Sequence, residues 1–167
     1  MIKAIVCVDK NWGIGKDNDL LFSLPSDMKF FRQTTLQKTV VMGGNTLRSF
    51  PGGNPLKNRT NIVISRTQVR DDCIIAPTME DFLKEIKSRV DEDVYVVGGA
   101  QIYREMLPYC EEILVTKVDA DGGATAFFPD LDEHPDFSCV DEGERREENG
   151  LSFRFTRYKN VNPKTLW

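Results

Sequence analysis

Hydrophobic and polar residues are arranged along this 167-residue chain so that short apolar runs alternate with helix-like segments. Nearly continuous apolar runs at residues 2–8, 39–43, 61–65 and 93–97 predict strands buried on both faces. Shorter or alternating runs predict further strands at residues 73–75, 112–118, 136–140 and 151–160, the last with Thr156 on its polar face. Between the last two, residues 141–150 predict a charged, solvated turn, and Phe127-Phe128-Pro129 is expected to pack inward.

The segments between these strands predict helices. Pro25 suits the first position of a helix, because its fixed φ fits there and its missing N–H is not needed. From this start Leu24, Met28 and Phe31 share one face of a helix that ends near Thr35. Other helices are predicted after Gly43-Gly44, after a Thr78 cap with Phe82, Leu83, Ile86 and Val90 as its buried stripe, and after Gly98-Gly99.

This order of elements predicts an α/β fold. Strands that alternate with helices, followed by an antiparallel pair, indicate a three-layer domain with a mixed, mostly parallel sheet. We expect about eight strands that end in an antiparallel hairpin, flanked by about four helices. The length suits one domain over residues 1–167, and no repeat or linker divides the chain.

Asp27 lies on or beside the apolar face of the helix that starts at Pro25. Burial of a carboxylate on such a face is costly unless another group uses it. The carboxylate is either an acidic residue favoured by the helix dipole, the commoner case for an isolated helix, or an acid at the back of an apolar pocket. The rest of the chain has to decide between the two.

Several candidate groups follow the carboxyl ends of predicted strands. Gly43-Gly44, Ser65-Arg66, Gly98-Gly99 and the long loop after Val8 all meet at that edge, where α/β sheets bind ligands. A strand, a glycine pair and a helix start can bind an anion through backbone N–H groups, although a plain strand–helix turn explains the same pattern. The sequence therefore predicts a ligand site at this edge.

Composition and charge argue against several classes of protein. The net charge of −4 and the lack of a basic run with aromatic residues argue against nucleic acid as a partner. No apolar run approaches the ~20 residues of a membrane span, and the first run is too short for a signal peptide. The cysteines lie far apart and His134, the one histidine, is expected at the surface, so neither metal nor disulfides are predicted. We expect a soluble cytoplasmic protein.

A set of motifs in fixed order resembles a known family. They are Gly13-Ile14-Gly15-Lys16, Leu24-Pro25-Ser26-Asp27, Val41-Met42-Gly43, Arg59, Val97-Gly98-Gly99, Tyr103, Thr116 and Phe127-Phe128-Pro129. Together they resemble the bacterial type of dihydrofolate reductase, from residue 1 to about residue 160. The resemblance implies a monomer in one-carbon metabolism that reduces 7,8-dihydrofolate with NADPH, which gives a hydride to C6 while N5 takes a proton. It also implies binding of antifolates such as trimethoprim.

The resemblance implies roles at the substrate. Asp27 would bind N3 and the 2-amino group of the pterin, with a pKa raised by burial, and Thr116 would orient it. Arg59 would bind the α-carboxylate of the glutamate tail. The catalytic set is Asp27, Phe22, Leu20 and Thr116. The substrate-binding set is Ile5, Val6, Asp27, Met28, Phe31, Phe50, Leu56, Arg59, Val97, Tyr103 and Thr116.

The resemblance also implies a cofactor site. Thr46 and Asn45 would donate to phosphate, Ser65 and Arg66 would bind the adenosine 2′-phosphate, and the Gly98–Gly99 peptide would be cis. The cofactor-binding set is Cys7, Ile14, Gly15, Asn18, Leu20, Gly43, Gly44, Asn45, Thr46, Ser65, Arg66, Val97, Gly98, Gly99, Ala100, Gln101, Ile102, Tyr103 and Thr125. No metal is expected.

Five residues depart from the family pattern. Phe22 stands where the family usually has Trp, so an indole N–H that holds a water near the pterin is missing. Leu21 replaces Pro in the loop after Val8, residues 9–22, which we call the lid. Thr125 replaces an Asp that ties its own loop to this lid. Gly44 and Gln101 stand where cations often bind the cofactor, so a weaker preference for NADPH over NADH is expected. We expect altered lid dynamics and antifolate sensitivity.

Two other functions fit parts of the pattern. The reductase of riboflavin biosynthesis shares the fold but lacks the arrangement of Pro25, Asp27 and Phe31 in this form. A catalytically weak folate- or nucleotide-binding module is the alternative from a different class, since the lid is altered. Oxidation of NADPH on addition of dihydrofolate separates an enzyme from such a module.

Overall fold

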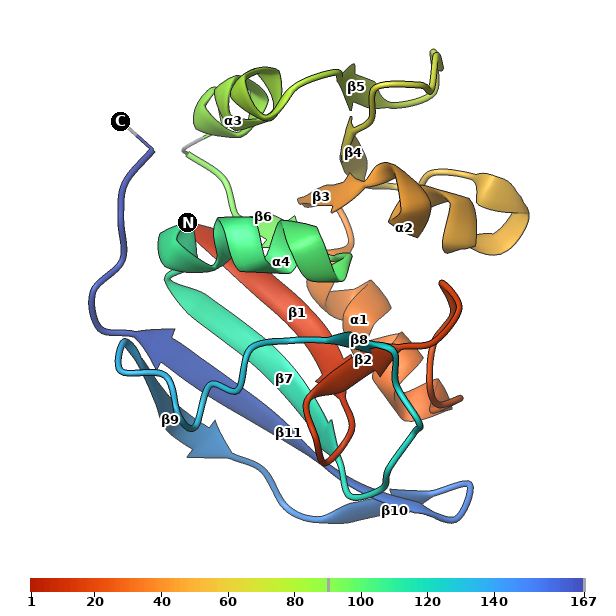
Figure 1. The fold of residues 1–167 in the computed structure, drawn as a ribbon, viewed down its shortest axis with the longest axis vertical. Coiled ribbons are helices and arrows are strands. Elements are labelled where there is room, and N and C mark those ends of the chain that lie inside the picture. Colours follow the sequence, from red (N-terminus) through yellow and green to blue (C-terminus); the bar gives the residue numbers. More distant parts are fainter. Residues whose placement is uncertain (90, 167) are drawn as a thin grey trace.

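A large mixed sheet forms the centre of the computed structural model, which describes residues 1–89 and 91–166 (Figure 1). Within these residues the strand order is β10-β11-β7-β1-β6-β3-β4-β5, with β9 also paired to β11. The strands are β1 (Ile2–Val8), β3 (Thr39–Gly43), β4 (Thr60–Ile64), β5 (Ile74–Ala76), β6 (Val94–Val96), β7 (Glu112–Val118), β9 (Phe137–Glu142), β10 (Arg146–Glu148) and β11 (Leu151–Asn160). Pairs from β7 to β5 are parallel, and β9, β10 and β11 add the antiparallel part. The predicted α/β fold is confirmed.

Helices cover both faces of this sheet, which gives the three layers. They are α1 (Pro25–Thr35), α2 (Gly44–Ser49), α3 (Met79–Lys87) and α4 (Ala100–Met106), with single turns η1 (Pro51–Gly53) and η2 (Leu107–Tyr109). Side chains of α3 and α4 share one apolar core with Ala4, Val6 and Val8 of β1. Residues of α1 and α2 pack against the opposite face, around Ile5 and Met42. Among the described residues no helix has the length and apolar character needed to cross a membrane.

Local signals explain where the helices start. Pro25 begins α1 as predicted, and the Thr78 hydroxyl accepts a hydrogen bond from Asp81 N at the start of α3. Phe82 and Ile86 are buried and Leu83 packs against the same core, as the predicted stripe requires. Val90, the last residue of that stripe, lies outside the described residues.

Three predictions about the second half of the chain are wrong in detail. Half of the charged segment 141–150 is strand, because β9 continues to Glu142 and β10 (residues 146–148) pairs with β11. Phe128 is buried, but Phe127 is 46% exposed, because it lies in β8 (Ala126–Phe127), which pairs with β2 (Gly13–Gly15). Thr156 is buried rather than solvated, since its Oγ1 donates to the carbonyl of Val115 at 2.7 Å.

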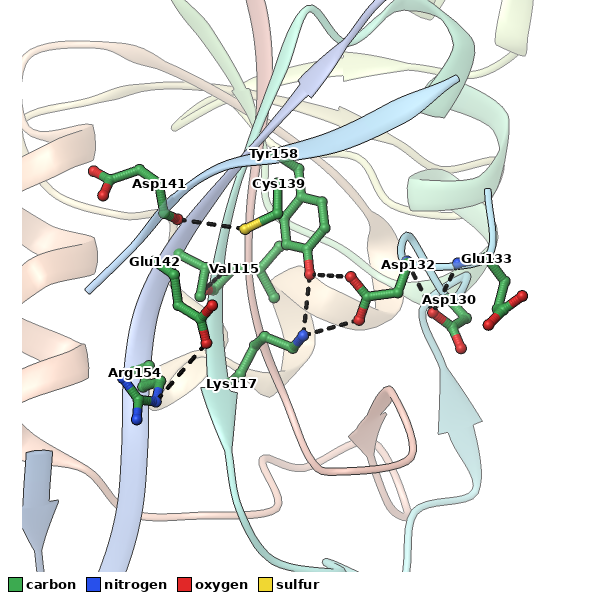
Figure 2. A network of polar contacts seen from close by, with 11 residues as sticks. Val115, Lys117, Asp130, Asp132, Glu133, Cys139, Asp141, Glu142, Arg154 and Tyr158 are labelled. Atoms are coloured by element: carbon green, nitrogen blue, oxygen red, sulfur yellow. Dashed lines mark hydrogen bonds and ion pairs between the residues drawn. The ribbon is translucent and has the colours of Figure 1, made fainter. Parts of the chain in front are cut away.

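A polar network holds the segment after β8 against the sheet (Figure 2). Lys117 Nζ donates to Asp132 at 3.0 Å and to the Tyr158 hydroxyl at 3.0 Å, and that hydroxyl donates to Asp132 at 2.6 Å. The Lys117 ammonium also lies 5.1 Å from the centre of the Trp12 ring. Trp12 belongs to the loop after β1, so this cluster joins that loop to β7, β11 and residues 130–133.

Candidate active site

Asp27, in the first turn of α1, meets Thr116 of β7. The Thr116 hydroxyl donates to Asp27 Oδ1 at 2.6 Å, and Thr116 is only 2% exposed. Burial raises the pKa of Asp27, while hydrogen bonds from Thr116 and Cys7 lower it and the negative charge of Glu148 raises it. The net direction is upward, so the protonated form is favoured relative to an exposed aspartate. The structure thus supports an acid in an apolar site rather than a simple helix-end residue.

Side chains of β1 complete the surroundings of this acid. Cys7 is the strand partner of Thr116 and shares an apolar cluster with Phe22 and Leu24. Burial, followed by the charge of Asp27, raises the pKa of the Cys7 thiol, which is therefore protonated at neutral pH. Two residues before Cys7 in β1, the carbonyl of Ile5 accepts a hydrogen bond from the Tyr103 hydroxyl at 2.7 Å. Cys7, Ile5 and Tyr103, all predicted at the ligand site, thus lie on or against the strand next to Thr116.

Apolar residues predicted at the substrate form one group beside the acid. The group packs around Ile5, Val40 and Met42 and includes Phe31, Phe50, Leu56 and Val97. Met28, predicted on the same helix face, is 59% exposed. Val6 faces the opposite core with α4, so its side chain is turned away from Asp27 and only its backbone is available on this side.

Arg59 lies at the far end of α1 from Asp27. Its Nη1 donates to Thr35 Oγ1 at 3.1 Å and its Nε donates to the carbonyl of Lys57 at 2.9 Å. Burial lowers the pKa of Arg59, and the positive charge of Arg32 lowers it further. Two cations side by side, one of them held in place, suit an anionic group of a ligand.

The glycine-ended strands meet as predicted at the carboxyl edge of the sheet. Gly43 N donates to the carbonyl of Gly98 at 2.9 Å, and the Gly98–Gly99 peptide is cis. A Cβ on Gly98, whose φ is +131°, would lie 3.2 Å from Thr46 Oγ1. Neither α2 nor α4 has a side-chain cap at its start, so their first backbone N–H groups face this edge without a capping side chain. Such an edge can accept phosphate groups.

The part of this edge that is predicted to bind the adenosine 2′-phosphate has few positively charged side chains held in place by hydrogen bonds. Gln68 Nε2 donates to the carbonyl of Gly44 at 3.2 Å, and the Ser65 hydroxyl accepts from Gln68 N at 3.2 Å. Arg66 is exposed. Gln101 is also exposed and donates to Glu105 on its own helix at 3.0 Å. Ser65 and Gly44 are thus adjacent, as the cofactor prediction requires.

The carboxylate of Asp9, which is not among the predicted site residues, holds the loop after β1. Asp9 is 3% exposed and accepts hydrogen bonds from Asn11 N at 2.8 Å, Gly13 N at 2.7 Å and Gly122 N at 3.0 Å. Its position directly after a buried strand is the sequence feature that marks Asp9 as a candidate functional residue. Asp9 therefore joins the lid to the segment after β7.

Further contacts of the lid involve residues predicted at the cofactor. Thr125 N donates to the carbonyl of Gly15 at 2.9 Å, and Asn18 Nδ2 donates to the carbonyl of Asn45 at 3.0 Å. A backbone bond from Thr125 thus ties the loop after β7 to the loop after β1. Leu20 is 69% exposed, so the lid does not bring it against Asp27.

Comparison with known proteins agrees with this site. A family model described as dihydrofolate reductase matches residues 1–160. A dihydrofolate reductase of Bacillus subtilis (strain 168) is 32% identical over 166 residues, covering 97% of this chain and 96% of the relative. That of Staphylococcus haemolyticus is 34% identical over 164 residues, covering 96% of each. A dihydrofolate reductase type 3 of Salmonella typhimurium is 35% identical over 132 residues, covering 78% of this chain and 79% of the relative. The chain belongs to the dihydrofolate reductase family and is an oxidoreductase that reduces dihydrofolate.

Proposed function

We propose that NADPH is the nicotinamide cofactor of this reductase and that Asp27 controls delivery of the proton to N5 of the pterin. The observation that carries the proposal is the 2.6 Å hydrogen bond from Thr116 to Asp27 beside apolar side chains. It fixes the Asp27 carboxylate beside the predicted substrate position. When bound, NADPH supplies the hydride that reduces C6.

Asp27 has two tasks in this proposal. Its carboxylate accepts hydrogen bonds from N3 and the 2-amino group of the pterin, which orients the ring. Its raised pKa brings the protonated form closer to neutral pH, where an acid is most useful for catalysis. N5 is out of direct reach of a group that binds N3, so the proton travels through water. Leu20 and Phe22 lie on the lid side of this path.

The remaining substrate contacts follow from the positions described above. The carbonyls of Ile5 and Val97 face the pterin edge, and Tyr103 holds the Ile5 carbonyl in place. The rings of Phe31 and Phe50 pack in the apolar group around Ile5 and Met42 and would line the slot for the pterin and benzoyl rings. The apolar slot and the basic end at Arg59 together suit a flat aromatic substrate that carries a carboxylate tail, and they also suit antifolates.

The proposed contacts to the phosphates of NADPH come mostly from backbone N–H groups and hydroxyl side chains, with few positively charged side chains. Gly98, Gly99 and Ala100 would hold the pyrophosphate at the start of α4, as that helix has no side-chain cap. Thr46 would donate to a phosphate from the start of α2. The adenosine 2′-phosphate would rely on Ser65 and Arg66.

A cation at position 44 is expected to strengthen selection of NADPH. Gly44→Arg should raise the ratio of kcat/KM for NADPH to that for NADH by about 10- to 100-fold, since a charged hydrogen bond contributes about 1.5–3 kcal/mol. A Cβ there would lie 3.0 Å from Gln68 Nε2, so the variant is also made with Gln68→Ala. NADH, which lacks the 2′-phosphate, is the internal control, and the Kd of each nucleotide measured by fluorescence gives a second readout. An unchanged ratio in both variants would contradict the assignment.

Phe22→Trp is expected to raise kcat and tighten trimethoprim binding, each by about fivefold, since the indole N–H adds one donor worth about 1 kcal/mol. Phe22 packs beside Leu24 and Cys7, near Asp27, and its ring has no donor for a water. Phe22→Leu is the matched control without a donor. Turnover and trimethoprim inhibition that stay the same in Phe22→Trp would remove the proposed role of the missing donor.

The domain organisation, location, oligomeric state and lack of a nucleic-acid partner stay predictions. We expect a single domain over residues 1–167 that is active as a cytoplasmic monomer and binds no nucleic acid. A binding module without turnover would bind dihydrofolate and NADPH but would not oxidise NADPH when both are present. The optical assay of NADPH oxidation therefore tests the proposal, and binding of both ligands without turnover would contradict it.

A further inference from the structure

The first turn of α1 lacks a capping side chain of its own. Its N-cap residue is Leu24, which offers no side-chain acceptor, and Pro25 follows at the first helical position. Asp27 N and Met28 N both donate to the carbonyl of Leu24 at 3.0 Å. This leaves Ser26 N as the first-turn donor that needs an acceptor from elsewhere.

That acceptor comes from the other end of the chain. Glu148, the last residue of β10, accepts a hydrogen bond from Ser26 N at 2.9 Å and another from Ser26 Oγ at 2.5 Å, across 122 positions of sequence. The next residue adds a third contact, since Asn149 Nδ2 donates to the carbonyl of Ser23 at 3.1 Å. The segment that leads into the catalytic helix is thus held from both sides of Leu24.

The hairpin that carries Glu148 has a fixed shape. Glu148 pairs with Leu151, so the turn consists of Asn149 and Gly150, with φ values of 52° and 74°. A two-residue Asn-Gly turn with both φ values positive matches the twist of the paired strands and sets their register. The carboxylate of Glu148 therefore reaches α1 from a defined position rather than from a loose loop.

We propose that Glu148 is a positioning residue for the reductase reaction, which holds the first turn of α1 where Asp27 meets Thr116 and the pterin. Ser26 and Asp27 are adjacent, so the bonds to Ser26 fix the backbone from which the catalytic carboxylate projects. Small displacements of a reacting group reduce the rate strongly, because they lower the share of reactive geometries.

The charge of Glu148 supports a second effect on the same acid. The groups that face Asp27 are Thr116 from β7, Cys7 from β1 and Glu148 from β10. Thr116 and Cys7 stabilise the ionised form of Asp27, whereas the negative charge of Glu148 destabilises it and raises the pKa. The bonds from Ser26 lower the pKa of Glu148 itself, so its charge persists at neutral pH. Glu148 thus couples the hairpin to the protonation of Asp27.

The test uses two substitutions of Glu148 in the full chain. Glu148→Gln keeps an oxygen for Ser26 N but removes the charge, and Glu148→Ala removes both. Glu144→Gln, an exposed residue in the segment before β10, is the control for loss of one negative charge. We measure kcat and KM for dihydrofolate across pH, and thermal unfolding of each variant.

In Glu148→Gln we expect the fall of kcat with rising pH to move to lower pH, with the plateau at acid pH retained. In Glu148→Ala we expect the same displacement and a loss of kcat of about 10-fold, with KM for NADPH unchanged. Glu144→Gln should behave as the parent. A parental pH profile in Glu148→Gln overturns the electrostatic part, and parental kcat in folded Glu148→Ala overturns the positioning role. If Glu148→Ala does not fold, Ser26→Ala, which removes the bond from Ser26 Oγ and keeps the charge of Glu148, replaces it, and a parental kcat in Ser26→Ala then overturns the positioning role. If the parent enzyme did not oxidise NADPH, that result would contradict the proposed cofactor and not the role of Glu148.

Discussion

Asp27→Asn is expected to lower kcat/KM for dihydrofolate at neutral pH by about 10²- to 10⁴-fold, the range typical for loss of a general acid. Asparagine keeps the shape of the side chain and can still accept the hydrogen bond from Thr116, so the change removes ionisation with little change in packing. The loss should narrow as the pH falls, because solvent acid then protonates N5 directly. Stopped-flow measurement of hydride transfer across pH checks this expectation.

The stability of the same variant provides the control. Because burial raises the pKa of Asp27 above its unfolded value, the carboxyl contributes stability that is fully present below the unfolded pKa. That contribution is lost as the pH rises through the folded pKa, since ionised Asp27 destabilises the fold. Asp27→Asn should therefore have a Tm at or above that of the parent at neutral pH. A lower Tm at neutral pH would point to lost structure as the cause of lost activity.

Arg59→Gln is expected to raise KM for dihydrofolate by about 10- to 100-fold, because hydrogen bonds to charged groups contribute about 1.5–3 kcal/mol. kcat should change little, since the tail is bound equally in the ground state and the transition state. The parent arginine is held by Thr35 and Lys57 beside Arg32, so it is already placed for a carboxylate.

The substrate itself offers the sharpest control for Arg59. A dihydropterin without the glutamate tail should show the same KM with Arg59→Gln and with the parent. Arg104→Gln, an exposed arginine on α4, matches the loss of charge at a distance. An equal rise of KM for the substrates with and without the tail would contradict the assignment of Arg59 to the carboxylate.

Much of the fold was predictable because its signals are local. The parallel strands β1, β3 and β4 carry long apolar runs, and Pro25 marks the start of α1 within one residue. The edge strand β10 was missed, because its residues 146–148 are charged and largely exposed, so they carry no apolar pattern. β2 and β8 were missed since strands of three and two residues are too short for a period to appear.

In the candidate site, too, some contacts were predictable from the sequence and others were not. Thr116 and Asp27 come together as the resemblance implies, and the glycine-ended strands meet at one edge. The sequence predicts a solvated turn around Glu148, because a contact with Ser26 that spans 122 positions leaves no periodic signal. Asp9 belongs to a predicted polar loop, but its carboxylate is buried and accepts hydrogen bonds from three backbone N–H groups.

The fate of the hydride tests the central claim most directly. The enzyme is mixed with dihydrofolate and NADPH that carries deuterium at the transferred position, and the product is analysed by NMR. The proposal predicts tetrahydrofolate with deuterium at C6, formed at a rate that falls as the pH rises through the pKa of Asp27. Binding of both ligands without label at C6, or transfer that is equally fast in Asp27→Asn at neutral pH, would contradict it.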